Sequence, residues 1–155
     1  MCAWIRACGG ASKSYDIYKN GNLEKGLYNQ PWKPSYSSHS PLGGGSITNN
    51  GTTLTLTSTG SSNAGTSFIT EEIDLTNINT VRFKVASYSH PYWDIGVVAS
   101  NQYANNYNVD VKMNAPAIGI NDIDVSAITG LHRLFIFAGG GNGMTLAFDS
   151  IECLV

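Results

Sequence analysis

The chain has 155 residues, which is enough for one well-buried core and too few for two ordinary domains. Only 13% of the residues are charged and the formal net charge is −2, so the composition argues against a nucleic-acid partner. The uncharged apolar stretches are much shorter than the roughly 20 residues that span a bilayer, so no membrane insertion is expected.

Apolar and β-branched residues alternate over short runs between Gly, Asn and Pro, which predicts strands throughout and no helix. The first run, Tyr15–Tyr18, enters a turn at residues 19–22, where Asn-Gly supplies the positive φ of a tight hairpin. A second hairpin is predicted at residues 46–57, with Leu54 and Leu56 facing inward and the threonines outward. Further strands are predicted at Thr66–Thr70, Thr80–Ala86, Tyr92–Ala99, Tyr107–Lys112, Ala117–Ile120, Leu131–Ala138 and Met144–Cys153. About nine strands at this spacing indicate an antiparallel sandwich or barrel.

Composition divides the chain into three parts. Residues 1–29 form an N-terminal strand and hairpin lead-in, residues 30–45 form a Pro- and Gly-rich loop with Trp32 and Tyr36, and residues 46–155 form the sandwich. Aromatic residues in this loop and in the N-terminal strand offer apolar area for self-association, so a homo-oligomer is expected.

Three cysteines, Cys2, Cys8 and Cys153, cannot all pair within one chain, and they lack the spacing of a zinc site. Free thiols fit assembly in a reducing cytosol. The first six residues lack a basic region followed by an apolar segment, so no secretory signal is expected.

Two stretches resemble each other, Glu72–Val81 and Asp122–Leu131. Each has an acidic residue, Ile-Asp, an aliphatic residue and Ser or Thr before an apolar strand. Asp and Ser/Thr side chains can bond nearby backbone groups and so organise a turn between strands. We prefer this turn interpretation to the alternative of a paired-carboxylate site.

The C-terminal part of the chain carries a recognisable series of segments: Ile123–Ser126, Thr129–Phe137, the Gly-rich run Gly139–Gly143, and Leu146–Ile151. This series resembles the closing strands of galactose-binding-like jelly rolls, including family 6-type carbohydrate-binding modules. The resemblance implies an all-β, antiparallel β-sandwich of the jelly-roll type. In those modules an acidic opening strand shares a structural calcium with an Asp of the last strand. Only Asp149 matches that pattern here, so neither a bound metal nor a cofactor is expected.

The N-terminal part has its own resemblance. Trp4–Gly10 and Tyr15–Gly21 are similar to the openings of small bacteriophage tail and baseplate proteins, in which an aromatic-rich strand enters a Lys-Asn-Gly turn. This resemblance implies a virion protein that assembles in the host cytoplasm with other virion subunits.

No pattern indicates an enzyme. The histidines His39, His90 and His132 are scattered, and His132 lies in a strand pattern where a structural role is expected. Neither Gly-x-Ser-x-Gly nor His-Glu-x-x-His occurs. Glu71 and Glu72 are adjacent, so in an extended strand they would point to opposite faces rather than flank a glycosidic bond.

Aromatic, Asn and His residues come together in two connections, Tyr88–Tyr92 and Asn101–Asn108. Flat rings cover the apolar faces of sugars, and amides bond their hydroxyls. Strand alternation assigns Trp93 to the core and leaves Tyr92 exposed. The candidate residues, for glycan or subunit contact, are Tyr88, His90, Tyr92, Tyr103, Asn105 and Tyr107.

Two functions follow from these patterns. The first is a structural protein of a bacteriophage virion, at the tail, baseplate or capsid surface, with possible binding of host glycans. The alternative is a carbohydrate-binding module of a secreted glycan-degrading system.

Overall fold

The computed structural model describes residues 14–30, 44–59, 65–102, 109–139 and 142–155, which form thirteen strands and no helix. A first sheet of seven strands contains β1 (Tyr15–Lys19), β2 (Asn22–Leu23), β4 (Gly45–Asn49), β5 (Leu54–Thr59), β8 (Thr80–Tyr88), β11 (Gly119–Asp124) and β13 (Asn142–Leu154). A second sheet of six contains β3 (Leu27–Asn29), β6 (Thr66–Thr70), β7 (Ile73–Asp74), β9 (Trp93–Ala99), β10 (Val111–Asn114) and β12 (Leu131–Ala138). None of the described residues builds a helix that could span a bilayer.

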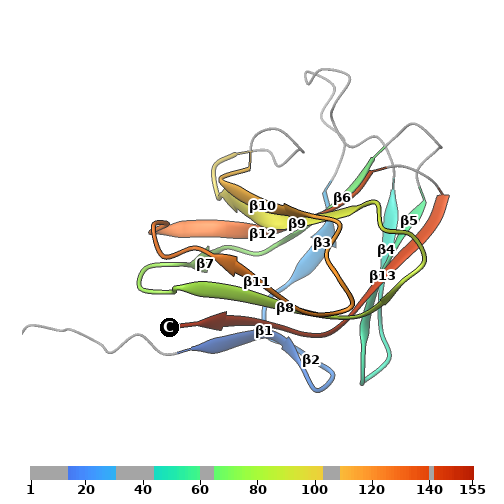
Figure 1. The fold of residues 1–155 in the computed structure, drawn as a ribbon, viewed down its shortest axis with the longest axis horizontal. Helices are drawn as coiled ribbons and strands as arrows, with labels where there is room; N and C mark the ends of the chain where they lie inside the picture. The colour runs from blue at the N-terminus through green and yellow to red at the C-terminus, as the bar shows by residue number, and fades with distance from the viewer. Residues whose placement is uncertain (1–13, 31–43, 60–64, 103–108, 140–141) are drawn as a thin grey trace, which may run out of the picture.

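The two antiparallel sheets face each other, which confirms the all-β sandwich (Figure 1). The strand count differs from about nine because β2, β3 and β7 have only two or three residues each. Such short strands contain no full alternation of apolar and polar residues, so the pattern alone does not reveal them.

The long strand β13 occupies the middle of the first sheet, between β1 (blue) and β8 (green) in Figure 1. One edge of β13 pairs with β8, and the other edge pairs first with β5 and then with β1. In the second sheet the order is β10-β9-β12-β6-β3. Residues 15–29 thus contribute strands to both sheets, while the proposed division of the chain into three parts stays a prediction.

Both predicted hairpins are present. Asn20 and Gly21 turn between β1 and β2 with φ values of 50° and 80°, and β4 pairs with β5 around Gly51, whose φ is 88°. Leu54 and Leu56 are fully buried, as the alternation predicted. The two turns also touch, because the Asn49 side-chain amide donates to the Gly21 carbonyl at 2.7 Å.

The repeated Asp residues organise turns, which confirms the turn interpretation. Asp74 Oδ1 accepts the Thr76 N–H and Asp124 Oδ1 accepts the Ser126 N–H, both at 2.9 Å. The two turns also bond each other, since the Val125 N–H donates to the Asn79 carbonyl at 2.9 Å.

Two predicted strands lie elsewhere. The strand predicted at 107–112 is β10 at Val111–Asn114, since 109 and 110 are not in a strand and 107 and 108 lie outside the described residues. The strand predicted at 117–120 is β11, which begins at Gly119 and continues to Asp124. The buried Asn121 side chain accepts the Ala117 N–H and donates to the carbonyls of Ala117 and Gly119, so it fixes a turn at these positions. Gly119, the first residue of β11, has a φ of 105°, so regular strand geometry begins only after it.

Two apolar clusters lie on opposite faces of the second sheet. The main core between the sheets includes Trp93, Phe68 and Leu134. A second apolar cluster consists of Ile69, Val98, Phe135 and Phe137. Since neighbours along a strand point to opposite faces, this cluster belongs to the outer face of the sheet.

Candidate functional site

The predicted ring Tyr92 stands at the end of the second sheet, with 65% of its surface exposed. It borders an open depression of about 290 Å³, which we call the Tyr92 depression. The described residues that line it are Pro91, Tyr92, Asp94, Asn114, Ala115 and Gly139. They come from the start of β9, the end of β10 and the residue after β12.

Backbone bonds on both sides hold this end of β9. The Gly139 N–H donates to the Tyr92 carbonyl at 2.7 Å, and the Ala115 N–H donates to the Trp93 carbonyl at 2.8 Å. Trp93 itself is buried in the main core, as predicted. The Tyr92 ring therefore projects from a rigid backbone, which reduces the entropy lost when a ligand covers it.

A carboxylate and an amide stand side by side in the depression. Asp94 and Asn114 are directly opposite in the register of β9 and β10, and both lie on the outer face of the sheet. Lys112 Nζ lies 3.9 Å from Asp94 Oδ2. Burial raises the pKa of Asp94, and the Lys112 charge opposes that rise. Together these side chains can accept hydroxyl hydrogens and donate an amide N–H.

His90 lies next to Tyr92, with ring centroids 6.3 Å apart and planes 20° from parallel. Its Nδ1 is 3.4 Å from Ser89 Oγ, and Ser89 Oγ accepts the Thr145 N–H at 2.9 Å. The serine hydroxyl hydrogen is then available to Nδ1. Nε2 takes no part in this contact, and as either donor or acceptor it can bond a ligand hydroxyl.

The structure brings together two of the six candidate residues, His90 and Tyr92. Tyr88 ends β8 and packs half-buried against the main core. Tyr103, Asn105 and Tyr107 lie outside the described residues. Asp94 and Asn114 were missed because they meet only through the β9–β10 register, which no local pattern reveals.

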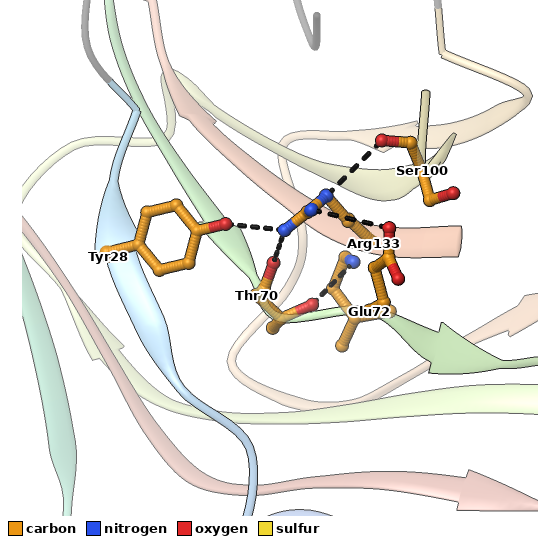
Figure 2. A network of polar contacts seen from close by, with 6 residues as sticks. Tyr28, Thr70, Glu72, Ser100 and Arg133 are labelled. Carbon is orange, nitrogen blue, oxygen red and sulfur yellow. Dashed lines mark hydrogen bonds and ion pairs between the residues drawn. The ribbon is translucent and has the colours of Figure 1, made fainter. Parts of the chain in front are cut away.

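A second polar group occupies the outer face of the same sheet, around Arg133 of β12 (Figure 2). Arg133 donates through Nη1 to the Tyr28 hydroxyl and to the Thr70 carbonyl, and through Nε to the Ser100 carbonyl. Its Nη2 lies 3.6 Å from Glu72 Oε1. The guanidinium thus joins segments from four parts of the chain, and we call these five residues the Arg133 network.

The exposed members of this network are Tyr28 and Glu72. Tyr28 is 39% exposed, and its hydroxyl accepts from Arg133, which leaves the hydroxyl hydrogen for a ligand. Arg133 is already bonded within the protein, because Nε and Nη1 donate to carbonyl oxygens and Nη2 pairs with Glu72. The network is a second surface with an aromatic ring beside a carboxylate.

Two further predicted positions, Asp149 and His132, have partners within the fold. Asp149 forms an ion pair with Lys84 at 3.3 Å. His132 is almost fully buried, with Nδ1 3.1 Å from the Gly130 carbonyl and Nε2 3.6 Å from Asp110, which confirms its structural role. Within the described ranges, no three His, Cys, Asp or Glu side chains are grouped so that they could hold a metal ion.

Comparison with solved structures returns carbohydrate-binding modules. One is a low-affinity xylan-binding module, CBM86, from Roseburia intestinalis, at 15% identity and a TM-score of 0.52, covering 83% of this chain and 93% of that one. Another is a family 29 carbohydrate-binding module with a Glu-to-Arg substitution, at 14% identity and a TM-score of 0.54, covering 91% and 90%. A third is a family 29 variant in complex with cellulohexaose, at 16% identity and a TM-score of 0.50, covering 91% and 89%.

These similarities show that the chain has the same sandwich fold as the CBM86 and family 29 modules. Neither a family model nor a curated protein matches the chain. No finding supports the bacteriophage resemblance of the N-terminal part, most of which lies outside the described residues.

Proposed function

We propose that this protein is a non-catalytic glycan-binding module and that the Tyr92 depression is its binding site. The observation that carries the proposal is the exposed Tyr92 ring on a fixed backbone, beside Asp94 and Asn114. A ring of this kind can cover the apolar face of a sugar, while the carboxylate and the amide bond its hydroxyls.

The fold supports the proposal. The similar structures include modules described as binding xylan or cellulohexaose, which are neutral polysaccharide and oligosaccharide ligands. In the family 29 module, tyrosine, arginine, lysine and aspartate were replaced to probe ligand recognition. The same residue types line the two polar surfaces described here.

The fold comparison supports one of the two functions predicted from sequence and not the other. Glycan binding agrees with the fold comparison and with the exposed rings, so we prefer the carbohydrate-binding module. The virion assignment, its partner subunits and its host-cytoplasm location have no supporting observation, and the homo-oligomer stays a prediction.

The test is isothermal titration with xylo-oligosaccharides, cello-oligosaccharides and the positive ligands of a glycan array. Tyr92→Ala should weaken binding by about 1 to 3 kcal/mol, because the sugar loses a packed contact. Tyr28→Ala is the matched control, since it removes an exposed ring from the Arg133 network. Circular dichroism verifies that both variants fold.

Unchanged binding by Tyr92→Ala together with a loss in Tyr28→Ala would move the site to the Arg133 network. An array on which no glycan binds would refute the function itself.

A further inference from the structure

The charged residue Asp94 of the Tyr92 depression forms an ion pair with Lys112, which lies beside the described lining residues and not among them. Asp94 is the acidic group among the described lining residues, and its Oδ2 lies 3.9 Å from Lys112 Nζ. Both side chains are largely covered, with 16% of the Asp94 side chain and 29% of the Lys112 side chain exposed. Each is therefore a near counter-ion of the other, and these two charges cancel.

This pairing matters because both charged side chains are largely covered from water, although they lie at an open depression. A charged group that enters it loses part of its hydration and must recover that cost from an opposite charge. An anionic sugar would have to draw Lys112 away from Asp94, and a cationic sugar would have to draw Asp94 away from Lys112. Either exchange breaks the existing ion pair between Asp94 and Lys112.

An uncharged sugar meets no such cost. Its hydroxyl hydrogens can bond Asp94, and its oxygens can accept from the Asn114 amide. His90 adds a third polar group, because its ring lies next to the Tyr92 ring with centroids 6.3 Å apart. Donors and acceptors for an uncharged sugar are thus present near the Tyr92 ring.

We infer that the Tyr92 depression selects uncharged glycans and discriminates against both acidic and amino sugars, through the mutual pairing of Asp94 and Lys112. This inference rests on the proposed function and adds the class of ligand. It assigns Asp94 a contact with the sugar, and it assigns Lys112 the role of holding the local charge at zero.

The experiment compares three probes of equal length: a neutral xylo-oligosaccharide or cello-oligosaccharide, an oligogalacturonate and a chitosan oligosaccharide. The wild-type protein should bind the neutral probe at least about tenfold more tightly than either charged probe, a difference of about 1.4 kcal/mol. Titrations at low and moderate salt separate local pairing from long-range attraction.

Two variants break the pair from opposite sides. Asp94→Asn leaves Lys112 without this counter-ion, so the ratio of oligogalacturonate affinity to neutral affinity should rise about tenfold. Lys112→Gln leaves Asp94 without its counter-ion, so the same ratio should rise for chitosan oligosaccharide. Each variant therefore shifts the preference in a different direction, which a general loss of folding cannot do.

Asp122→Asn is the matched control. Asp122 pairs with Arg82 at 2.8 Å on the first sheet, so this variant makes the same charge change away from the depression. It should leave all three affinities in the wild-type ratio. Circular dichroism of each variant verifies the fold.

The outcomes are distinct. Equal wild-type affinity for neutral and charged probes would overturn the inference and leave glycan binding intact. Equal shifts in Asp94→Asn and Asp122→Asn would overturn the role of the pair. Binding of no probe and no array glycan would remove the proposed function, and the inference with it.

Discussion

Two buried hydroxyls of β6, on Ser67 and Thr70, have opposite effects on stability. Thr70 Oγ1 accepts the Leu134 N–H at 2.9 Å, so it replaces a backbone carbonyl in the ladder between β6 and β12. Ser67 Oγ is fully buried and has no hydrogen-bond partner among the residues that the structure describes. A buried polar group costs free energy unless it is bonded, so these two hydroxyls contribute with opposite sign.

We expect Ser67→Ala to raise the free energy of unfolding by about 1 kcal/mol, because it removes the desolvation cost of an unpaired hydroxyl. Thr70→Val keeps the shape but leaves the Leu134 N–H unbonded, and it should lower the free energy of unfolding by about 1 to 3 kcal/mol. Urea denaturation of both variants measures the two changes. A destabilised Ser67→Ala would show that the hydroxyl is bonded in solution.

At the residue scale, alternation along a strand could be predicted and contacts across strands could not. The sequence placed Trp93 inside and Tyr92 outside, and both positions are confirmed. It gave no sign that Asp94 faces Asn114, because that pairing depends on the β9–β10 register. The predicted residues 103, 105 and 107 fall outside the described structure, so their contribution to the site stays a prediction.

At the scale of elements, the two Asn-Gly hairpins demonstrate how turn chemistry fixes local structure. Both glycines have positive φ, yet their surroundings differ. A Cβ on Gly51 would meet no atom within 4 Å, whereas a Cβ on Gly21 would lie 2.5 Å from the Gly51 carbonyl oxygen. The close approach of these two turns therefore adds a second constraint at Gly21 alone.

Gly51→Ala should destabilise the protein by about 1 to 2 kcal/mol, the cost of left-handed backbone for a residue with a Cβ. Gly21→Ala should cost more, because its Cβ also forces the two turns apart. Thermal unfolding of the two variants compares the effects, with Gly51→Ala as the reference for the φ cost alone. Equal melting temperatures would mean that the turns separate freely.

The elements that sequence patterns could predict are those with turn signals or several alternating residues. The hairpins at Gly21 and Gly51 and the Asp-organised turns are confirmed because local side chains determine them. The start of β11 was wrong because Asn121 bonds back to the turn before it. A single side chain with several backbone bonds can override the pattern of a strand.

At the scale of the whole molecule, several aspartates favour the folded state only while they are ionised. The Thr76 hydroxyl and N–H lower the pKa of Asp74, Arg82 lowers the pKa of Asp122, and Ser126 lowers the pKa of Asp124. In the unfolded chain these groups return to the ordinary value of 3.8. The unfolded state therefore takes up protons first as the pH falls.

The free energy of unfolding should consequently fall as the pH drops towards 3.8 and through the lower folded-state pKa values. Urea unfolding at a series of pH values measures this acid limb. Asp122→Asn should make the limb shallower, since it removes one of the linked protons. An unchanged slope in that variant would show that the Arg82 pair does not survive in solution.

The position of β13 also determines when the first sheet can form during synthesis. It follows the other twelve described strands, yet it fills the middle of the first sheet and supplies partners to β1, β5 and β8. During synthesis, the strands of the second sheet leave the ribosome while the first sheet still has a gap at its centre. Those three strands have unpaired edges until β13 arrives, and pairing over so long a sequence separation is slow. The first sheet therefore remains open to mispairing until β13 is free to insert, so the emergence of this one strand governs when the sandwich closes.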